Sequence, residues 1–191
     1  WTVAHDERAE ETLKTMGMRL GALQRPQVVR ADLATLAARV REAAGSDVAF
    51  DAVIGRNILY NQADKAGVAA GILSLCGSDG VVVLAESIPS AGQRLSERLN
   101  LSPKSLSKKF KKAEDAVFAD TANPLVNWTR GSLEEELRKI RPGGVRSFEE
   151  TFSPRRRMTP DDVAFWFREG GQGPKSLGDR LREILSADEL T

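Results

Sequence analysis

In the first half of the chain, short runs of apolar residues alternate with segments whose apolar residues recur three and four positions apart. The short runs are rich in strand-forming residues and predict strands over residues 1–5, 26–31, 49–55 and 81–86. The segments with helical spacing predict helices over residues 7–23, 33–44 and 62–76. This alternation predicts a parallel sheet with helices on both faces, and the run at 49–55 is apolar enough to be buried on both.

The second half of the chain is less regular. Helices are predicted over residues 91–99, 104–119, 132–140, from 159 onward, and over 177–185. Ser102 and Pro103 open the second of these helices, because proline fits the first helical position. Ser132 and Glu135 form a capping box for the third. Side chains of residues 145–152 that would lie on opposite faces of a strand are mixed apolar and polar on both faces. The segment therefore predicts a strand without a clean apolar face.

Composition narrows the class of protein. Among 191 residues, 41% are apolar and 29% are charged, as in a soluble globular chain of one domain with at most a short appendage. The single cysteine, Cys76, excludes an internal disulfide, and the single histidine, His5, excludes a two-histidine metal site, so we expect no metal. No apolar run reaches about 18 residues and no targeting segment is visible, so we expect a cytoplasmic protein without a membrane partner.

Polar residues follow three of the predicted strands. Asp6 and Asp32 come directly after the first two, where a carboxylate can accept hydrogen bonds from ribose hydroxyls or from an adenine amino group. Each aspartate also suits the cap of the helix that follows, so capping is the alternative interpretation. Gly55, Arg56 and Asn57 end the third strand and offer close backbone approach, a cation and an amide. The alternative there is an ordinary solvated turn.

These strand ends resemble those of class I S-adenosylmethionine-dependent methyltransferases. Residues 1–6, 28–33, 50–59 and 79–84 are similar to that superfamily's second, third, fourth and fifth strands with their loops. The resemblance implies a Rossmann-like α/β fold, with a mostly parallel sheet and helices on both faces, and S-adenosylmethionine as cofactor. The cofactor-binding residues that it implies are Asp6, Asp32, Leu33, Gly55, Arg56 and Asn57.

The family's first strand and its glycine-rich loop have no counterpart in this sequence. No G-x-G motif lies near the start, where Trp1 already belongs to a predicted strand. In the family the first strand lies between the second and the fourth, so we expect a sheet with a central gap and unpaired backbone groups. We interpret the chain as truncated at its N-terminus, with the first strand supplied by residues upstream.

A narrower resemblance covers the whole chain. The runs 83–89, 93–95, 113–120, 124–128 and 157–160 look like the methyltransferase-like domain fused behind some RarA/MgsA-type AAA+ ATPases. That family acts in replication-fork maintenance and recombination, so the resemblance implies an AAA+ module in the same full-length chain. A Walker A motif is absent, so this chain does not hydrolyse ATP by that route. We expect a methyltransferase-like domain over 1–153 and a C-terminal helical extension over 154–191, packed on it.

Basic residues concentrate in two segments of the second half. Residues 94–112 contain seven basic residues and one acid, Glu97, and residues 155–157 are consecutive arginines. We expect nucleic-acid contacts at Lys104, Lys108, Lys109, Lys111, Lys112, Arg155, Arg156 and Arg157. Phe110 and Trp128 can stack on bases if they are exposed. The alternatives are a solvated helix face for the lysines and a core position for Phe110.

The sequence therefore predicts an accessory, non-catalytic methyltransferase-like domain of a replication or recombination ATPase, in contact with DNA or a partner protein. The alternative is an S-adenosylmethionine-dependent methyltransferase whose cofactor loop lies upstream of residue 1. A structural domain for oligomer assembly is the third interpretation. Whether the chain is an enzyme stays open, because His5 has no evident catalytic partner and Cys76 is more typical of a packed residue.

Overall fold

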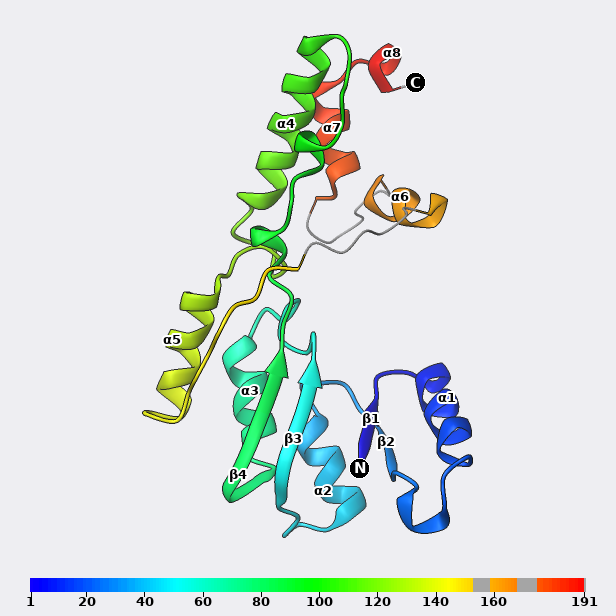
Figure 1. The fold of residues 1–191 in the computed structure, drawn as a ribbon, viewed down its shortest axis with the longest axis vertical. Coiled ribbons are helices and arrows are strands. Elements are labelled where there is room, and N and C mark those ends of the chain that lie inside the picture. Colours follow the sequence, from blue (N-terminus) through cyan, green and yellow to red (C-terminus); the bar gives the residue numbers. More distant parts are fainter. Residues whose placement is uncertain (153–158, 168–174, 191) are drawn as a thin grey trace. The chain divides into compact units, whose positions relative to one another are not determined.

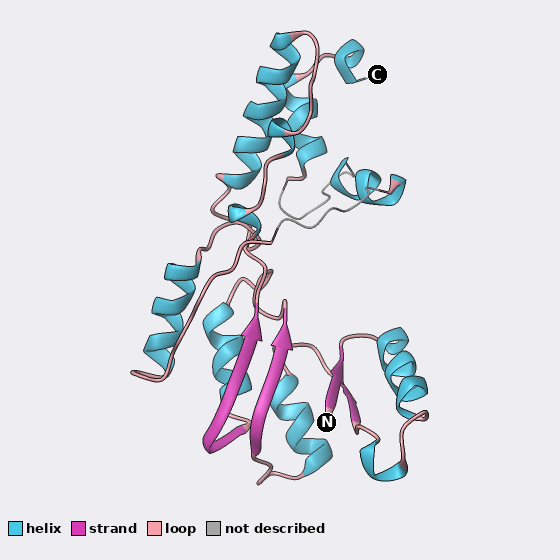
Figure 2. Cartoon of the chain, viewed as in Figure 1, coloured by secondary structure: helices cyan, strands magenta, loops and turns pink. Residues whose placement is uncertain are grey.

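The computed structural model describes residues 1–152, 159–167 and 175–190. The chain divides into two compact units, Trp1–Glu86 and Ser87–Thr191, called here the N-terminal unit and the C-terminal unit. All strands found in the described residues lie in the N-terminal unit, and the described part of the C-terminal unit consists of helices and loops (Figure 2). The domain boundary predicted after residue 153 falls outside the described residues.

Strands and helices alternate along the N-terminal unit, as predicted (Figure 1). The strands are β1 (Thr2–Ala4), β2 (Val28–Arg30), β3 (Phe50–Arg56) and β4 (Cys76–Ala85). The helices between them are α1 (Glu7–Gly17), α2 (Leu36–Ala44) and α3 (Lys65–Leu73). The turn Ala22–Gln24 is a short 3-10 helix. The order of elements is confirmed, and each helix is shorter than its predicted range.

The four strands form two separate parallel sheets. β1 pairs with β2, with Val3 opposite Val29, and β3 pairs with β4, with Ile54 opposite Val83. Among the described residues, no strand joins β1 to β3. This separation agrees with the central gap that the sequence predicts, but one continuous Rossmann-like sheet is not formed. The fold is mixed α/β with two small parallel sheets.

Hydrogen bonding leaves one edge of β1 open. The N–H of Thr2 donates to the carbonyl of Gln27 at 2.8 Å, on the β2 side. Successive residues of a strand present their backbone polar groups to opposite sides, so those of Val3 point away from β2. At the start of β1 and β3, the rings of Trp1 and Phe50 meet edge to face, with 6.5 Å between centroids. The two sheets therefore meet here through side chains and not through backbone hydrogen bonds.

The strand that was expected to be buried on both faces is exposed on one. Helix α3 packs against β4. Ile54 keeps 80% of its surface accessible, and the exposed Val81 and Val83 lie on the same face of the sheet. The prediction for 49–55 was therefore wrong. An apolar run shows that a strand can be buried, but its periodicity does not show how many faces are covered.

The two aspartates at strand ends behave differently at the helices that follow. The carboxylate of Asp6 accepts from the N–H of Ala9 at 2.7 Å, which confirms capping at α1. Asp32 is not the cap of α2, because that helix begins at Leu36, directly after Thr35. The capping interpretation is therefore wrong for Asp32, since a tight turn separates it from the first helical residue.

Five helices lie in the described part of the C-terminal unit: α4 (Lys104–Phe118), α5 (Arg130–Ile140), α6 (Pro160–Phe167), α7 (Leu177–Ile184) and α8 (Ala187–Leu190). The helices predicted over 104–119, from 159 onward, and over 177–185 are confirmed. None of the described helices is long and apolar enough to cross a membrane.

The helix predicted over 91–99 is wrong. This segment forms two short 3-10 turns, Pro89–Ala91 and Leu95–Glu97. The N–H groups of Leu95 and Ser96 donate to the side chain of Glu114 on α4, at 2.6 and 3.0 Å. A distant carboxylate thus takes the donors that a continuous helix would have used.

Helix α5 begins two residues before its predicted start. The hydroxyl of Thr129 accepts from the N–H of Ser132 at 3.2 Å, and the Ser132 hydroxyl accepts from the N–H of Thr129 at 2.9 Å. This reciprocal pair caps the helix, so Ser132 is a member of the box but its partner is not Glu135.

The strand predicted over 145–152 is not formed. The segment is extended and lies along α5 (Figure 1). The Ser147 hydroxyl donates to a Glu134 oxygen at 2.6 Å, and Arg130 lies 3.7 Å from Glu149. Side chains of a helix hold the segment, because the described part of this unit offers no strand edge for it to pair with.

The core of the C-terminal unit lies where α4 packs against α7. Phe110 and Ala113 of α4 and Leu181 of α7 are buried. Partly buried apolar side chains surround them: Leu95, Leu101, Phe167, Leu177, Ile184 and Leu185. Full burial of a side chain such as Leu or Phe contributes about 1.5–3 kcal/mol, so this contact anchors the basic helix.

Candidate functional site

The carboxyl ends of all four strands face one edge of the N-terminal unit, because the strands point the same way (Figure 1). Asp6 and Asp32 follow the neighbouring ends of β1 and β2, and Gly55, Arg56 and Asn57 lie at the end of β3. The structure thus gathers the predicted residues into two groups, one at each sheet. In open parallel sheets this edge is where ligands bind.

The carboxylate of Asp6 already has two partners. It accepts from the N–H of Ala9 and lies 2.8 Å from Nε2 of His5. The His5 side chain is largely exposed to solvent. An exposed imidazole beside a helix cap lacks the enclosed surroundings that tune a general base. This corner is therefore organised for capping.

Asp32 keeps an exposed carboxylate at the end of β2. Its backbone carbonyl accepts from the N–H of Thr35 at 3.0 Å, which forms the turn before α2. Its side chain has no hydrogen bond or ion pair with the other described residues. Leu33 beside it is half-buried. Asp32 thus retains its full capacity to accept hydrogen bonds from a ligand.

The loop after β3 is held by one carboxylate, that of Glu86 at the end of β4. Its oxygens accept from the N–H groups of Ile58, Leu59 and Tyr60, at 2.9, 3.1 and 2.9 Å. Asn57, at the start of the loop, has a positive φ of 53°, which asparagine tolerates better than most residues. These charge-assisted hydrogen bonds fix the backbone of the loop at the edge formed by the strand ends.

Close packing requires a glycine at position 55. A Cβ there would lie 2.0 Å from Cδ1 of Ile58 and 3.0 Å from Cδ2 of Leu84. The close approach expected at Gly55 is therefore present, but the neighbour is the chain's own Ile58. Arg56 is exposed beside it. Of the residues at this strand end, Arg56 offers the freest side chain.

Glu86 ends the strand predicted over 81–86, but nothing near it in the sequence indicates a role for it. Its partners lie 26 to 28 residues earlier in the chain. No local spacing reveals such a contact. A single carboxylate directly after an apolar strand was the available signal, and it shows where Glu86 lies but not what it binds.

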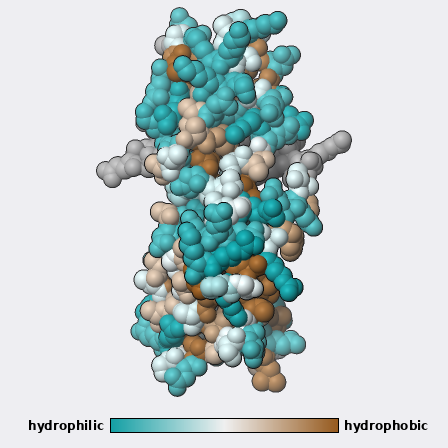
Figure 3. Space-filling model, turned by 90° about the vertical axis from the view of Figure 1, so that its left-hand side faces the viewer, coloured by the Kyte–Doolittle hydropathy of each residue, from teal (hydrophilic) through white to brown (hydrophobic). Residues whose placement is uncertain are grey.

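Four of the predicted lysines form an exposed face on α4. Lys104, Lys108, Lys111 and Lys112 are exposed, and their spacing puts them on one side of the helix. Lys111 lies 3.8 Å from Asp115, which shares this side. The upper part of Figure 3, where α4 lies in Figure 1, is covered mainly by hydrophilic residues.

Lys109 serves a different purpose from the other lysines of α4. Its ammonium donates to both carboxylate oxygens of Glu189 on α8, at 2.8 and 2.7 Å. The hydrogen bond from Lys109 is the main reason why the pKa of the Glu189 carboxyl lies below its usual value of 4.5. Lys109 therefore ties α8 to α4.

The aromatic residues expected to stack on bases are buried. Phe110 is 5% exposed and Trp128 is 6% exposed. Stacking needs an accessible ring face, so the condition for stacking is not met at either residue. Phe110 belongs to the core, as its alternative interpretation holds. Arg155, Arg156 and Arg157 lie outside the described residues.

Glu114 anchors the loop before α4. Its carboxylate is almost completely buried and accepts hydrogen bonds from the N–H groups of Leu95 and Ser96. In the same loop, the guanidinium of Arg94 lies 3.3 Å from the ring centroid of Phe118. Through this cation–π contact Arg94 contributes to packing, although it belongs to the basic segment 94–112 of the sequence.

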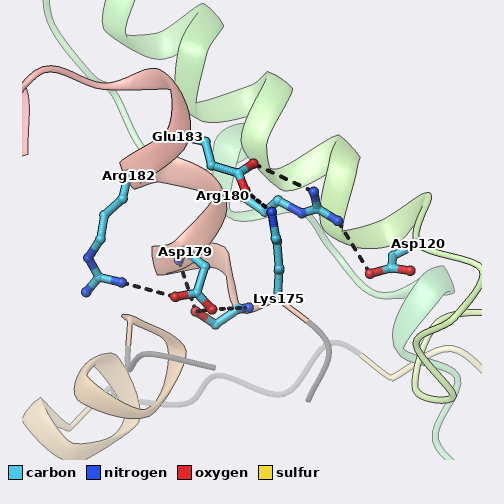
Figure 4. A network of polar contacts seen from close by, with 7 residues as sticks. Asp120, Lys175, Asp179, Arg180, Arg182 and Glu183 are labelled. Atoms are coloured by element: carbon cyan, nitrogen blue, oxygen red, sulfur yellow. Dashed lines mark hydrogen bonds and ion pairs between the residues drawn. The ribbon is translucent and has the colours of Figure 1, made fainter. Parts of the chain in front are cut away.

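An ion pair ties α7 to the segment after α4, and further ion pairs lie within and beside α7 (Figure 4). Arg180 lies 3.4 Å from Asp120 and 3.7 Å from Glu183. Lys175 also pairs with Glu183, and its hydrogen bond is the largest cause of the lowered pKa of that carboxyl. With the apolar core, the pair of Arg180 and Asp120 holds α7 against α4 and gives the lysine face a fixed backbone.

A metal-binding cluster of three or more His, Cys, Asp or Glu side chains is not found among the described residues. Comparison of the chain with protein-family models, with curated proteins and with solved structures gave no match. The residues and their geometry are therefore the basis for assigning a function.

Proposed function

We propose that the chain is a non-catalytic, methyltransferase-like accessory domain of a replication or recombination AAA+ ATPase, and that it contacts DNA through α4. The observation that carries the DNA contact is the exposed lysine face. Lys104, Lys108 and Lys112 have no acidic partner among the described residues. The ATPase partner follows from the resemblance of the sequence and stays a prediction.

The geometry at the strand ends favours an accessory role over catalysis. Asp6 is used for capping, and Gly55 for packing against Ile58. Asp32 and Arg56 are the exposed charged side chains left at this edge. Two isolated charges can bind part of a ligand, but they do not form a general base with an orienting partner.

Fluorescence anisotropy with a labelled DNA duplex tests the DNA contact. At about 50 mM salt, where phosphate contacts are strong, we expect the full chain to bind. Replacing Lys104, Lys108 and Lys112 together by Glu should weaken binding by more than about tenfold, because attraction becomes repulsion. Lys139→Glu, at an exposed lysine of α5, is the matched control. Absence of binding by the unmodified chain would contradict the proposal.

A methyltransferase is the second candidate function, and the gap between the two sheets favours it. The outer edge of β1 is open, and β3 has no second strand neighbour among the described residues. One further parallel strand between β1 and β3 would complete the order that the resemblance implies. Its C-terminal end would lie at the same edge as Asp32 and Arg56.

The residues of this chain fit one end of S-adenosylmethionine. The exposed Asp32 carboxylate is an acceptor suited to the adenosine end, and Leu33 can offer an apolar contact. A glycine-rich loop for the methionine end does not occur at the described strand ends. When bound, the cofactor would supply the methyl group, and this chain would contribute orientation of the adenosine.

Calorimetry with S-adenosylmethionine on the full-length protein separates the two candidates. Binding that is lost in Asp32→Ala favours the methyltransferase. Asp51→Ala is the matched control, because Asp51 is an exposed aspartate near the opposite end of β3. If the full-length protein does not bind the cofactor, the second candidate is contradicted and the accessory role is favoured.

A further inference from the structure

Three lysines of α4 stand in a single row. Lys104, Lys108 and Lys112 are four residues apart, so each lies about 6 Å further along the helix axis and the row spans about 12 Å. All three are exposed. The other two lysines of α4 each have an acidic partner. The row therefore presents three positive charges that no described acid neutralises.

The backbone that carries this row is fixed before any ligand binds. Phe110 and Ala113 on the opposite side of α4 pack against Leu181. Glu114 holds the preceding loop through two backbone N–H groups. Binding then orders only the lysine side chains, which lowers the entropic cost of association.

The chemistry of the row suits phosphates and not bases. A lysine ammonium is a compact point charge and lacks the planar fork that reads guanine. Of the two aromatic residues of α4, Phe110 is buried and the ring of Phe118 lies against the guanidinium of Arg94, so neither gives a free stacking platform. Proteins that bind single strands depend on such platforms, whereas a duplex offers the denser line of phosphates.

We propose that the row of Lys104, Lys108 and Lys112 docks on the phosphate backbone of duplex DNA and contacts no base. This assignment rests on the proposed DNA-contacting function and adds the class of DNA and the mode of recognition. Each lysine neutralises about one phosphate and releases its counterion, so binding is independent of sequence and weakens steeply with salt.

Salt titration of the full chain tests the assignment. Affinity is measured by anisotropy for two duplexes of unrelated sequence and for one of their single strands, from about 50 to 200 mM salt. The two duplexes should bind equally and the single strand more weakly. Replacing all three lysines by Gln should reduce the slope of log affinity against log salt by about 2.7, since each phosphate contact contributes about 0.9.

The controls separate this assignment from the broader function. Lys139→Gln should leave the slope unchanged, and circular dichroism should show that the triple variant keeps its helices. Preference for the single strand or for one sequence overturns the assignment and leaves the DNA contact standing. An unchanged slope in the triple variant also overturns it and places the contact elsewhere. Binding to vesicles of phosphatidylserine but to no DNA overturns the proposed function as well.

Discussion

In each unit, one carboxylate accepts hydrogen bonds from backbone N–H groups of a neighbouring loop, but the two carboxylates differ in burial. Glu86 accepts hydrogen bonds from three backbone N–H groups of the loop after β3, and Glu114 accepts two from the loop before α4. Glu86 is half-buried, whereas Glu114 is 3% exposed. Water can reach the Glu86 carboxylate more easily than the Glu114 carboxylate. Burial, and not the number of bonds, should therefore decide how much each carboxylate contributes.

Replacement of Glu114 by Ala is expected to have the largest effect. Two N–H groups would lose their acceptor inside the C-terminal unit, which lowers the free energy of unfolding by about 3 kcal/mol. Urea denaturation measures this loss. Glu135→Ala, at an exposed position of α5, should change it by less than about 0.5 kcal/mol. Equal effects of the two variants would show that burial of Glu114 contributes nothing.

Glu86→Ala is expected to cost less, although it removes more hydrogen bonds. Ile58 and Tyr60 are half-buried and water can solvate their freed N–H groups, whereas Leu59 is fully buried, so we expect about 1–2 kcal/mol and a local effect. Hydrogen exchange should accelerate at Ile58, Leu59 and Tyr60 and stay unchanged in α1. Acceleration throughout the N-terminal unit would contradict the local role, and unchanged exchange at these three amides would contradict the hydrogen bonds themselves.

Two glycines of the N-terminal unit extend the comparison from hydrogen bonds to packing. Gly55→Ala places a methyl group against Ile58, which should cost about 1–3 kcal/mol through overpacking. Gly71 lies in α3 with open space at its Cβ position, so Gly71→Ala should stabilise the unit by about 0.5–1 kcal/mol. Thermal melts of both variants give the signs, and a shared sign would show that the two sites do not differ in packing.

Local patterns predicted the elements of this chain better than its contacts. The four strands of the N-terminal unit, and the cap at Asp6, follow from neighbouring residues, because apolar alternation and capping act over a few positions. The bonds of Glu86 and Glu114 connect residues 18 to 28 positions apart, and no short-range pattern encodes them. The exposure of Ile54 was missed for a related reason. A strand's own sequence does not say which helices cover it.

The candidate sites show the same contrast between features set by local patterns and features set by distant contacts. The lysine face of α4 could be predicted, because spacing of four residues on a helix puts side chains in line. The pairing of Lys109 with Glu189, 80 positions away, could not be predicted, and it removes Lys109 from the exposed face. Asp32 was expected at a strand end and lies there, but its free carboxylate depends on where α2 begins. That start was misplaced, since the turn at Thr35 has no strong local signal.

Acid sensitivity is the smallest expected effect, and it is not confined to the C-terminal unit, because the pKa of the Glu10 carboxyl in α1 is also lowered, mainly by the hydrogen bond from Lys14. The pKa values of Glu183 and Glu189 lie below 4.5, mainly because of hydrogen bonds from Lys175 and Lys109. A carboxyl whose pKa is lowered by folding stabilises the folded state fully above its unfolded pKa. That stabilisation is lost as the pH falls through the lower, folded value. The C-terminal unit should therefore melt at a lower temperature below about pH 4.5 than at neutral pH.

The variant Glu189→Gln tests this dependence. It removes the titrating group, so the melting temperature of the C-terminal unit should fall slightly at neutral pH and vary less with acid. The shift should be smaller than for any variant above, because both members of the pair are partly exposed to solvent. Glu135→Gln serves as the control. Identical pH profiles for Glu189→Gln and the unmodified chain would show that the bond to Lys109 does not stabilise the docking of α8. The support of the lysine row would then come from the apolar core, Glu114 and the pair of Arg180 with Asp120.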